Sequence, residues 1–457
     1  MQLSINPATG EELARFEDHD ATFIDTALDR AVAAQRSWRA LEVVDRVALL
    51  RRIATVLRAN LARYAQLIVF EVGKPVVEAE EEVEKCAKNC DFYAENAAAY
   101  LADEAVQSNA TQSMISYDPL GVVLAIMPWN YPFWQFFRFA APAFAAGNGA
   151  VLKHANNVPQ CAEAIKEVLA AAGAPDGLAE VLLIPPGAVA DLIADDRIAA
   201  VTLTGSTHVG TIVAAQAGQA LKKQVLELGG SDPFIVLSDA DIEQAAAMAV
   251  KARYINVGQS CVNAKRFIVE DSVADAFVEA FKRHVEALVV GDPFDRTTQI
   301  GPMARQNLRD ELHRQVEATR GEGGVVVVGG TPVDRPGFYY APTIIDHVTS
   351  TMTAAREETF GPVAAILRVP DVETAIRLAN ETEFGLGASL WTSDLARART
   401  IVRRIDAGAV FVNGIVASDP RLPFGGVKRS GYGRELGIVG MREFTNIKTV
   451  WIGPAQA

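Results

Sequence analysis

One cysteine stands in a sequence context that suits a nucleophile. Cys261 lies in the segment NVGQSCVNAKR, where small and polar residues replace the apolar stripe expected around a merely packed thiol. The other three cysteines fit packing, because Cys86 and Cys90 are one helical turn apart without a second ligand pair or a nearby His, and Cys161 opens a helix. Four cysteines in 457 residues do not indicate a disulfide framework and favour a reducing cytoplasm.

A nucleophilic thiolate requires a base and a donor for the developing oxyanion. Six His are present without an obvious partner motif, so Glu227, which ends an apolar strand before two glycines, is the better candidate base. Asn130 follows Pro-Trp at the end of a strand, and its amide could donate to an oxyanion. Taken singly, Glu227 could be a surface or helix-capping residue and Asn130 a turn residue or N-cap.

A third segment suits a nucleotide phosphate. Residues 205–210, GSTHVG, follow a strand and open a helix, where backbone N–H groups meet an anion. The pattern is neither GxGxxG nor a P-loop, so by itself it is weak support for nucleotide binding.

Composition limits the remaining classes of protein. Half of the residues are hydrophobic, and 43 Lys and Arg against 56 Asp and Glu leave a formal charge of -13, which disfavours nucleic acid as a partner. The start of the chain shows no secretory signal, and no apolar run reaches the length of a membrane span. A globular enzyme of two or three domains in the cytoplasm is expected.

The elements that must position these residues form two regions. The first hundred residues are expected to be helical, with helices over 45–64 and within 72–100. From residue 120 strands alternate with helices, which predicts a parallel sheet covered on both faces. The expected strands and helices are 121–129, a helix after Pro132, 149–155, 159–172, 180–184, 199–205 and 209–221. A second α/β region covers 232–435, and the tail 444–453 is expected to pair with 107–119, within one subunit or across an interface.

Six motifs in a fixed order resemble the aldehyde dehydrogenase superfamily over nearly the whole chain. They are PWN at 128–130, TGS at 204–206, ELGG at 227–230, GQSC at 258–261, EETFGP at 357–362 and PFGGVKRSG at 423–431. The resemblance implies a Rossmann-like cofactor domain (1–106 and 120–229), an α/β catalytic domain (230–435) and a small β oligomerisation element (107–119 and 436–457). It also implies homodimers or homotetramers.

The resemblance also assigns roles to residues. Cys261 would be the nucleophile and Glu227 the general base, and Asn130 with the backbone N–H of Cys261 would form the oxyanion hole. An aldehyde would be oxidised through a hemithioacetal and a thioester, without a metal. The residues implied to bind the cofactor are Trp129, Asn130, Lys153, Asn156, Gly205, Ser206, Leu228, Glu358 and Phe360.

Two positions bear on cofactor and substrate. Asn156 replaces a Glu that often holds the ribose hydroxyls in the family, which removes repulsion of a 2′-phosphate and predicts NADP in preference to NAD. Arg138, eight residues after Asn130, resembles the carboxylate clamp of succinate-semialdehyde dehydrogenases, with Ser418 and Phe424 as further substrate contacts. Ile255 departs from that group, some members of which have a further Arg there.

Alternatives remain open at this stage. Arg138 could instead be tied up in an ion pair, which would leave a broad-specificity aldehyde dehydrogenase or one for glutarate semialdehyde. A CoA-acylating enzyme is disfavoured because Glu227 is present. A non-catalytic homologue would be expected to lack the nucleophile, the base or the oxyanion Asn, and this chain has all three.

Overall fold

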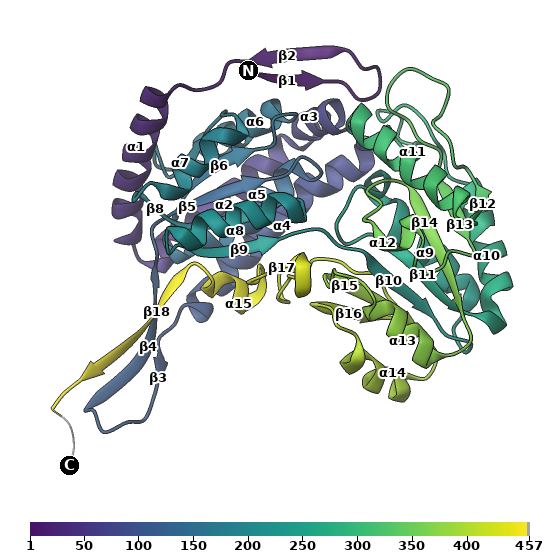
Figure 1. Cartoon of the computed structure of the whole chain (residues 1–457). Coiled ribbons are helices and arrows are strands. Elements are labelled where there is room, and N and C mark those ends of the chain that lie inside the picture. The colour runs from purple at the N-terminus through teal and green to yellow at the C-terminus, as the bar shows by residue number, and fades with distance from the viewer. Residues whose placement is uncertain (455–457) are drawn as a thin grey trace.

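The computed structural model describes residues 1–454 and contains two sheet-based lobes and a protruding ribbon (Figure 1). The first lobe is built on a six-stranded sheet in the order β17-β9-β8-β5-β6-β7, parallel except for β17. Its strands are β5 (Val122–Met127), β6 (Gly149–His154), β7 (Ala179–Val181), β8 (Ile198–Thr204), β9 (Lys223–Glu227) and β17 (Gly431–Tyr432). The predicted alternation of strands and helices from residue 120 is therefore confirmed.

Two groups of helices cover opposite faces of this sheet. One core combines α2–α6 with Val123, Ala125 and Met127 of β5, and another combines α1, α7 and α8 with Val122, Leu124 and Ile126. Because β5 is buried on both faces, it is apolar without alternation. The helices are α1 (Ala21–Arg39), α2 (Val43–Ala59), α3 (Leu61–Val72), α4 (Val76–Tyr100), α5 (Pro132–Ala146), α6 (Pro159–Ala171), α7 (Val189–Ala194) and α8 (Thr207–Gln219).

The N-terminal hundred residues are less uniformly helical than expected. Residues 2–16 form a hairpin of β1 (Gln2–Ile5) and β2 (Glu12–Phe16), which turns at Pro7 and at Gly10, whose φ is +79°. The helix expected over 45–64 ends at Ala59, because Asn60 leaves helical backbone angles before α3 begins. Local breakers thus override the helical period.

The second lobe is built on a seven-stranded sheet in the order β12-β13-β14-β11-β10-β15-β16, with only β12 antiparallel to its neighbour. Its strands are β10 (Asp232–Val236), β11 (Ala264–Glu270), β12 (Val325–Val328), β13 (Thr343–Asp346), β14 (Val363–Val369), β15 (Gly387–Trp391) and β16 (Ala409–Val412). Its helices are α9 (Ile242–Tyr254), α10 (Asp271–Glu286), α11 (Gln306–Gly321), α12 (Thr353–Arg356), α13 (Val372–Asn380) and α14 (Leu395–Ile401). The described residues also contain the 3₁₀ turns η1 (Pro186–Ala188), η2 (Ile255–Gly258), η3 (Val402–Arg404) and η4 (Lys428–Ser430).

The protruding ribbon is a three-stranded antiparallel sheet of β3 (Glu104–Ala105), β4 (Gln112–Pro119) and β18 (Thr445–Ile452). β18 pairs with β4 from Thr445 opposite Pro119 to Ile452 opposite Gln112, within one chain. This confirms that the tail pairs with the segment 107–119. α15 (Gly437–Arg442), just before β18, packs against α5 and α4.

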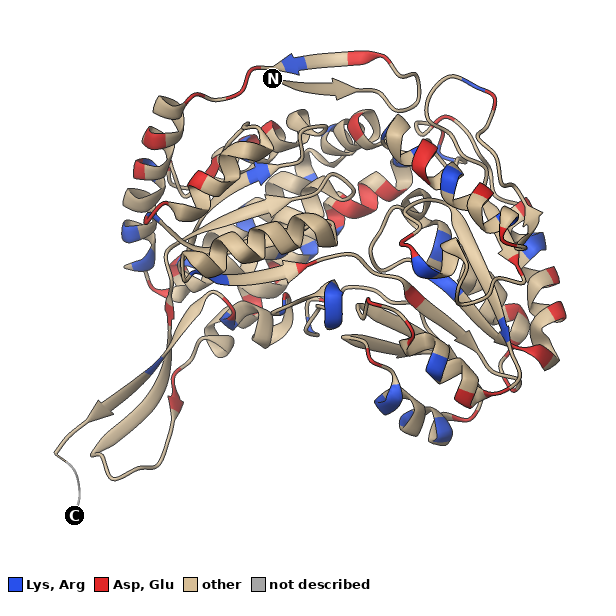
Figure 2. Cartoon of the chain, in the orientation of Figure 1, with Lys and Arg blue, Asp and Glu red and all other residues tan. Residues whose placement is uncertain are grey.

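The end of the second region returns to the first lobe. β17 pairs with β9, and a Cβ on Gly431 would lie 1.9 Å from the carbonyl oxygen of Leu226, so this approach requires glycine. Residues 431–432 therefore complete the first sheet although they lie within the range 230–435. Figure 2 shows acidic and basic residues interspersed over both lobes. Among the described residues no helix is long and apolar enough to cross a membrane.

Candidate active site

Cys261 follows a turn in an unusual backbone conformation. Asn256, Val257 and Gly258 in η2 have φ of 53°, 56° and 71°, all in the left-handed region. Such a conformation is costly for a β-branched residue such as Val257, by about 1–3 kcal/mol. A Cβ on Gly258 would lie 2.3 Å from the carbonyl oxygen of Gly361, so the turn is pressed against the neighbouring loop.

A buried asparagine holds this turn in place. The backbone N–H of Asn256 donates to Oε2 of Glu78 at 2.7 Å, and its side-chain Nδ2 donates to the carbonyl oxygens of Asn130 and Gln259 at 2.9 and 3.0 Å. These bonds connect the Cys261 turn to α4 and to the end of β5. The strained backbone persists because several elements determine it together.

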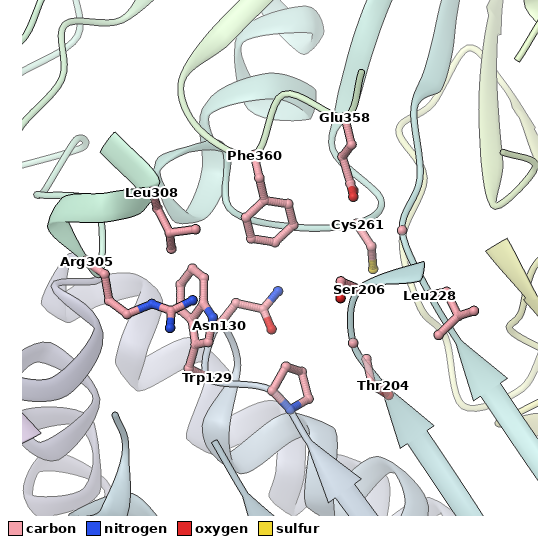
Figure 3. A pocket seen from close by; sticks show the side chains of 13 residues that line it. Trp129, Asn130, Thr204, Ser206, Leu228, Cys261, Arg305, Leu308, Glu358 and Phe360 are labelled. Carbon is pink, nitrogen blue, oxygen red and sulfur yellow. The ribbon is translucent and has the colours of Figure 1, made fainter. Parts of the chain in front are cut away.

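Cys261 lies where two cavities meet. A cavity of about 240 Å³ contains Cys261 in its wall together with residues from the ends of β5, β8 and β9 (Figure 3). A second cavity, of about 430 Å³, also has Cys261 in its wall and extends along α4, α5 and the loop after β16. A carbon atom bound to Cys261 is therefore accessible from both cavities.

Asn130 lines the first cavity beside Cys261, and Figure 3 shows its amide turned toward the space between them. Its Nδ2 donates one hydrogen to the carbonyl oxygen of Gln259 at 3.0 Å. An amide nitrogen carries two hydrogens, so the second is free for an oxyanion. Asn130 lies three residues after the end of β5, at the carboxyl edge of the sheet where ligands bind in this architecture.

Lys265 is fully buried next to Cys261. Its Nζ donates to the carbonyl oxygens of Ser260, Cys261 and Asn263 at 3.1, 2.9 and 3.4 Å. It also lies 3.4 Å from Oε1 of Glu358, which accepts from the N–H of Gly230 at 3.0 Å. One lysine thus positions both the nucleophile loop and Glu358.

The glycines of ELGG permit this packing. A Cβ on Gly229 would lie 2.6 Å from Oε2 of Glu358, and one on Gly230 would lie 2.6 Å from the carbonyl oxygen of Cys261. Neither position has room for a side chain.

Burial raises the pKa of the Cys261 thiol to about 12, with nearby Lys265 and Arg138 opposing the effect and Glu227 and Glu358 adding to it. The resting sulfur is therefore a thiol, and a proton must leave it before it can attack a carbon.

Glu227 lies outside both cavities. It is 2% exposed, and neither carboxyl oxygen has a hydrogen-bond partner among residues 1–454. Burial and the nearby Glu435 raise its pKa well above the usual range, while Arg138 opposes the shift. Burial likewise raises the pKa of Glu435, which forms an ion pair with Nε of Arg138. Two buried carboxyls thus lie near one guanidinium, and only Glu435 forms an ion pair with it.

The first cavity has the features of a dinucleotide site. Gly205 and Ser206 connect β8 to α8, and the Ser206 hydroxyl accepts from the N–H of Val209 as the N-cap. The Trp129 and Phe360 rings form an aromatic wall with centroids 5.8 Å apart, and Leu228 and Glu358 lie opposite. Gly210 lets α8 approach the wall, since a Cβ there would lie 2.4 Å from Leu228.

Lys153 and Asn156 are brought together outside this cavity. The Lys153 Nζ donates to Oδ1 of Asn156 at 2.6 Å and to the carbonyl oxygen of His154 at 2.8 Å. Burial lowers the pKa of Lys153 to about 8. No carboxylate among the described residues forms an ion pair with it, so the pair presents positive charge next to a neutral amide.

The second cavity is lined by Arg138, Ser418 and Phe424, together with Lys85 and Trp134. Arg138 is 2% exposed and lies 4.9 Å from the Phe424 ring centre, and its Nη2 donates to Oγ1 of Thr204 at 3.2 Å. Its ion pair with Glu435 matches the alternative interpretation of Arg138, in which a neighbouring carboxylate occupies it.

The aldehyde dehydrogenase family model matches residues 2–450. The chain belongs to the aldehyde dehydrogenase family. It is 51% identical over 449 residues to a probable NADP(+) succinate-semialdehyde dehydrogenase of Synechocystis, covering 98% of this chain and 99% of that one. It is also 51% identical to an NAD(P)+ succinate semialdehyde dehydrogenase of Escherichia coli K12, covering 98% and 97%. A succinic semialdehyde dehydrogenase structure from Streptococcus pyogenes in complex with NADP+ superposes with a TM-score of 0.97 at 36% identity, covering 99% of this chain and 100% of that one.

Most of the residues expected at the site of this aldehyde dehydrogenase lie at the two cavities. Glu227, Lys153 and Asn156 do not line either one. No cluster of His, Cys, Asp or Glu that could hold a metal occurs within residues 1–454.

Sequence reasoning missed Lys85, Lys265 and Glu435. Lys265 had a signal, because a lysine inside an apolar strand requires buried partners. Lys85 and Glu435 had none, since their partners lie on distant segments.

Proposed function

We propose that this enzyme oxidises succinate semialdehyde to succinate with NADP⁺ as the hydride acceptor and Cys261 as the nucleophile. The observation that carries the proposal is the position of Cys261 between two cavities. One has an aromatic wall and a helix N-terminus. The other contains Lys85 and Arg138, and of its acidic residues Glu78, Glu81 and Glu82, Glu82 is paired with Lys74 and Glu78 accepts from Asn256. The printed names of the Synechocystis and E. coli relatives support the same substrate.

In the first step Cys261 gives its proton to solvent water and Sγ attacks the aldehyde carbon, so that a C–S bond forms, the C=O π bond breaks and the carbonyl oxygen becomes an oxyanion. The free amide hydrogen of Asn130 and the backbone N–H of Cys261 donate to this oxygen. A single donor of this kind contributes about 3–4 kcal/mol to the transition state. The carbon then loses its hydrogen with the electron pair, which leaves a thioester on Cys261.

When bound, NADP⁺ supplies the acceptor for that hydride. The N–H groups at the start of α8, after Gly205 and Ser206, would hold its phosphates. Trp129, Leu228 and Phe360 would surround the nicotinamide and Glu358 its ribose. Lys153 and Asn156 would receive the adenine ribose, where a positive charge beside a neutral amide favours a 2′-phosphate.

Glu227 would act after hydride transfer. It takes a proton from water, which attacks the thioester carbon, and the C–S bond breaks to release succinate. Because its carboxyl lies outside both cavities, its side chain must turn toward Cys261 for this step.

A broad-specificity aldehyde dehydrogenase is the second candidate. The ion pair of Arg138 with Glu435 favours it, because a guanidinium already paired with a carboxylate attracts a second one less strongly. Glutarate semialdehyde would be the neighbouring substrate within the carboxylate-bearing class.

Steady-state NADPH formation with succinate semialdehyde and with butanal tests the proposal. Wild type is expected to have the higher kcat/KM on succinate semialdehyde, and Cys261→Ala is expected to form no NADPH. Equal efficiency on the two aldehydes would refute the substrate assignment. Activity that survives in Cys261→Ala would refute the nucleophile, and no activity in wild type would support a non-catalytic homologue.

The assembly and location are part of the proposal. The ribbon exposes Ile447, Trp451 and Ile452 at 62%, 49% and 46%, and such an apolar edge suits pairing between subunits of a homodimer or homotetramer. All four cysteines are free thiols, which suits the cytoplasm. Sedimentation equilibrium measures the oligomeric state directly.

A further inference from the structure

Lys85, on α4, lies in the wall of the same cavity as Cys261. Its Nζ donates to the hydroxyl oxygen of Ser418 at 2.7 Å, across 333 positions of sequence. The same nitrogen lies 4.2 Å from the centre of the Trp134 ring, within cation–π distance. An aromatic face on α5 and a hydroxyl from the loop after β16 therefore hold the ammonium group in place.

Within residues 1–454 no carboxylate forms an ion pair with Lys85, and Glu82 and Asp419 act on its charge only from a longer distance. Arg138 pairs with Glu435 and the buried Lys74 pairs with Glu82, whereas no carboxylate lies within ion-pair distance of Lys85. Burial lowers the pKa of Lys85 to about 8, which reflects the cost of this charge away from water. Lys251 also lines the cavity, but it is exposed and solvated.

We propose that Lys85 is the cation that binds the substrate carboxylate, with the Ser418 hydroxyl as its partner donor, while the charge of Arg138 is largely matched by Glu435. This inference rests on the proposed oxidation of a carboxylate-bearing aldehyde. Lys85 uses one N–H on Ser418 and keeps two for a ligand, and Ser418, which accepts from Lys85, keeps its O–H to donate. A carboxylate placed between them would supply the missing counter-ion.

Lys85→Met tests this assignment, because methionine keeps a long unbranched side chain without the charge. The measured quantity is the ratio of kcat/KM on succinate semialdehyde to kcat/KM on butanal. We expect the ratio to fall about 10- to 100-fold, through KM on the acid substrate, as for a lost charged hydrogen bond. The inhibition constant of succinate, titrated as a product inhibitor, is expected to rise in the same variant. Lys85→Arg is expected to restore part of the ratio.

Lys88→Met is the matched control. Lys88 is exposed on the same helix, three residues further along, and lies outside the cavity. The Lys88→Met variant is expected to keep the wild-type ratio of kcat/KM on the two aldehydes. NADP⁺ affinity measured by fluorescence quenching shows whether each variant is folded.

The outcomes separate the two proposals. If wild type prefers succinate semialdehyde and Lys85→Met keeps the whole preference, the role of Lys85 is refuted and the substrate assignment stands. If wild type shows no preference, the proposed function itself fails. A loss on both aldehydes with unchanged succinate inhibition would make Lys85 structural and overturn the inference.

Discussion

Replacing Lys265 by Met should destabilise the nucleophile loop and make Cys261 less acidic. The ammonium group is fully buried and donates to three loop carbonyls, and it pairs with Glu358. Methionine fills the same volume but leaves these acceptors without a donor. The variant therefore isolates the charge and the hydrogen bonds from the packing.

The expected loss in the free energy of unfolding follows from the environment of Lys265 and of each group that it contacts. Each hydrogen bond to a charged group is worth about 1.5–3 kcal/mol, and removing one partner of a buried ion pair costs about 3–5 kcal/mol. The desolvation of Lys265, which lowers its pKa, offsets part of this gain. The Glu358 side chain is 21% exposed and can regain water. We therefore expect a loss near 3 kcal/mol in the free energy of unfolding, measured by urea denaturation.

The same change should slow alkylation of the thiol. Lys265 is the largest influence that opposes the raised pKa of Cys261, so its loss raises that pKa further. At a given pH below about 12, the fraction of Cys261 present as thiolate then falls by about 10-fold for each pH unit by which its pKa rises. Iodoacetamide reports on Cys261 because the other three cysteines are buried.

Lys282→Met, on the surface of α10, is the control and should leave both measurements at their wild-type values. An alkylation rate and an unfolding free energy that match wild type in Lys265→Met would refute this reasoning.

Two further substitutions test the remaining roles. The Glu227→Gln variant should form the thioester on Cys261 but hydrolyse it slowly, because the amide cannot take a proton from water. Rapid mixing should show a burst of one NADPH per site followed by slow turnover, and a linear time course without a burst would contradict the assignment. Asn156→Glu should lower the affinity for NADP⁺ and raise the relative affinity for NAD⁺, because a carboxylate repels the 2′-phosphate and accepts from a free hydroxyl. Fluorescence titration of both cofactors measures this, and unchanged affinities would argue against Asn156 as the discriminating residue.

The first sheet could be predicted from the sequence because its strands leave a strong local signal. β5, β6 and β8 are short, largely apolar runs separated by helical segments. The hairpin of β1 and β2 left no comparable signal, since each strand is short and partly exposed. The ribbon of β4 and β18 was predictable as a pair but not as a contact within one subunit.

The residues of the site likewise fall into those that the sequence predicted and those that it did not. Cys261, Asn130 and the Gly205–Ser206 connection could be predicted because ordered motifs and strand ends mark them. The position of Glu227 outside both cavities could not, because it depends on Glu435 and Arg138, which meet it from two other segments. Sequence reasoning likewise offered both a substrate clamp and an ion pair for Arg138 without choosing between them.

The sequence by itself indicated the family, Cys261 as the candidate nucleophile and the succession of strands and helices along the chain, because these depend on local residue types and on the apolar pattern of each segment. Only the tertiary structure decided which buried charges have partners. Arg138 is paired and Lys85 is not, because long-range contacts bring Glu435 to one and Ser418 to the other. A charge taken out of water acts according to its nearest counter-charge, and that neighbour is set by packing rather than by sequence distance.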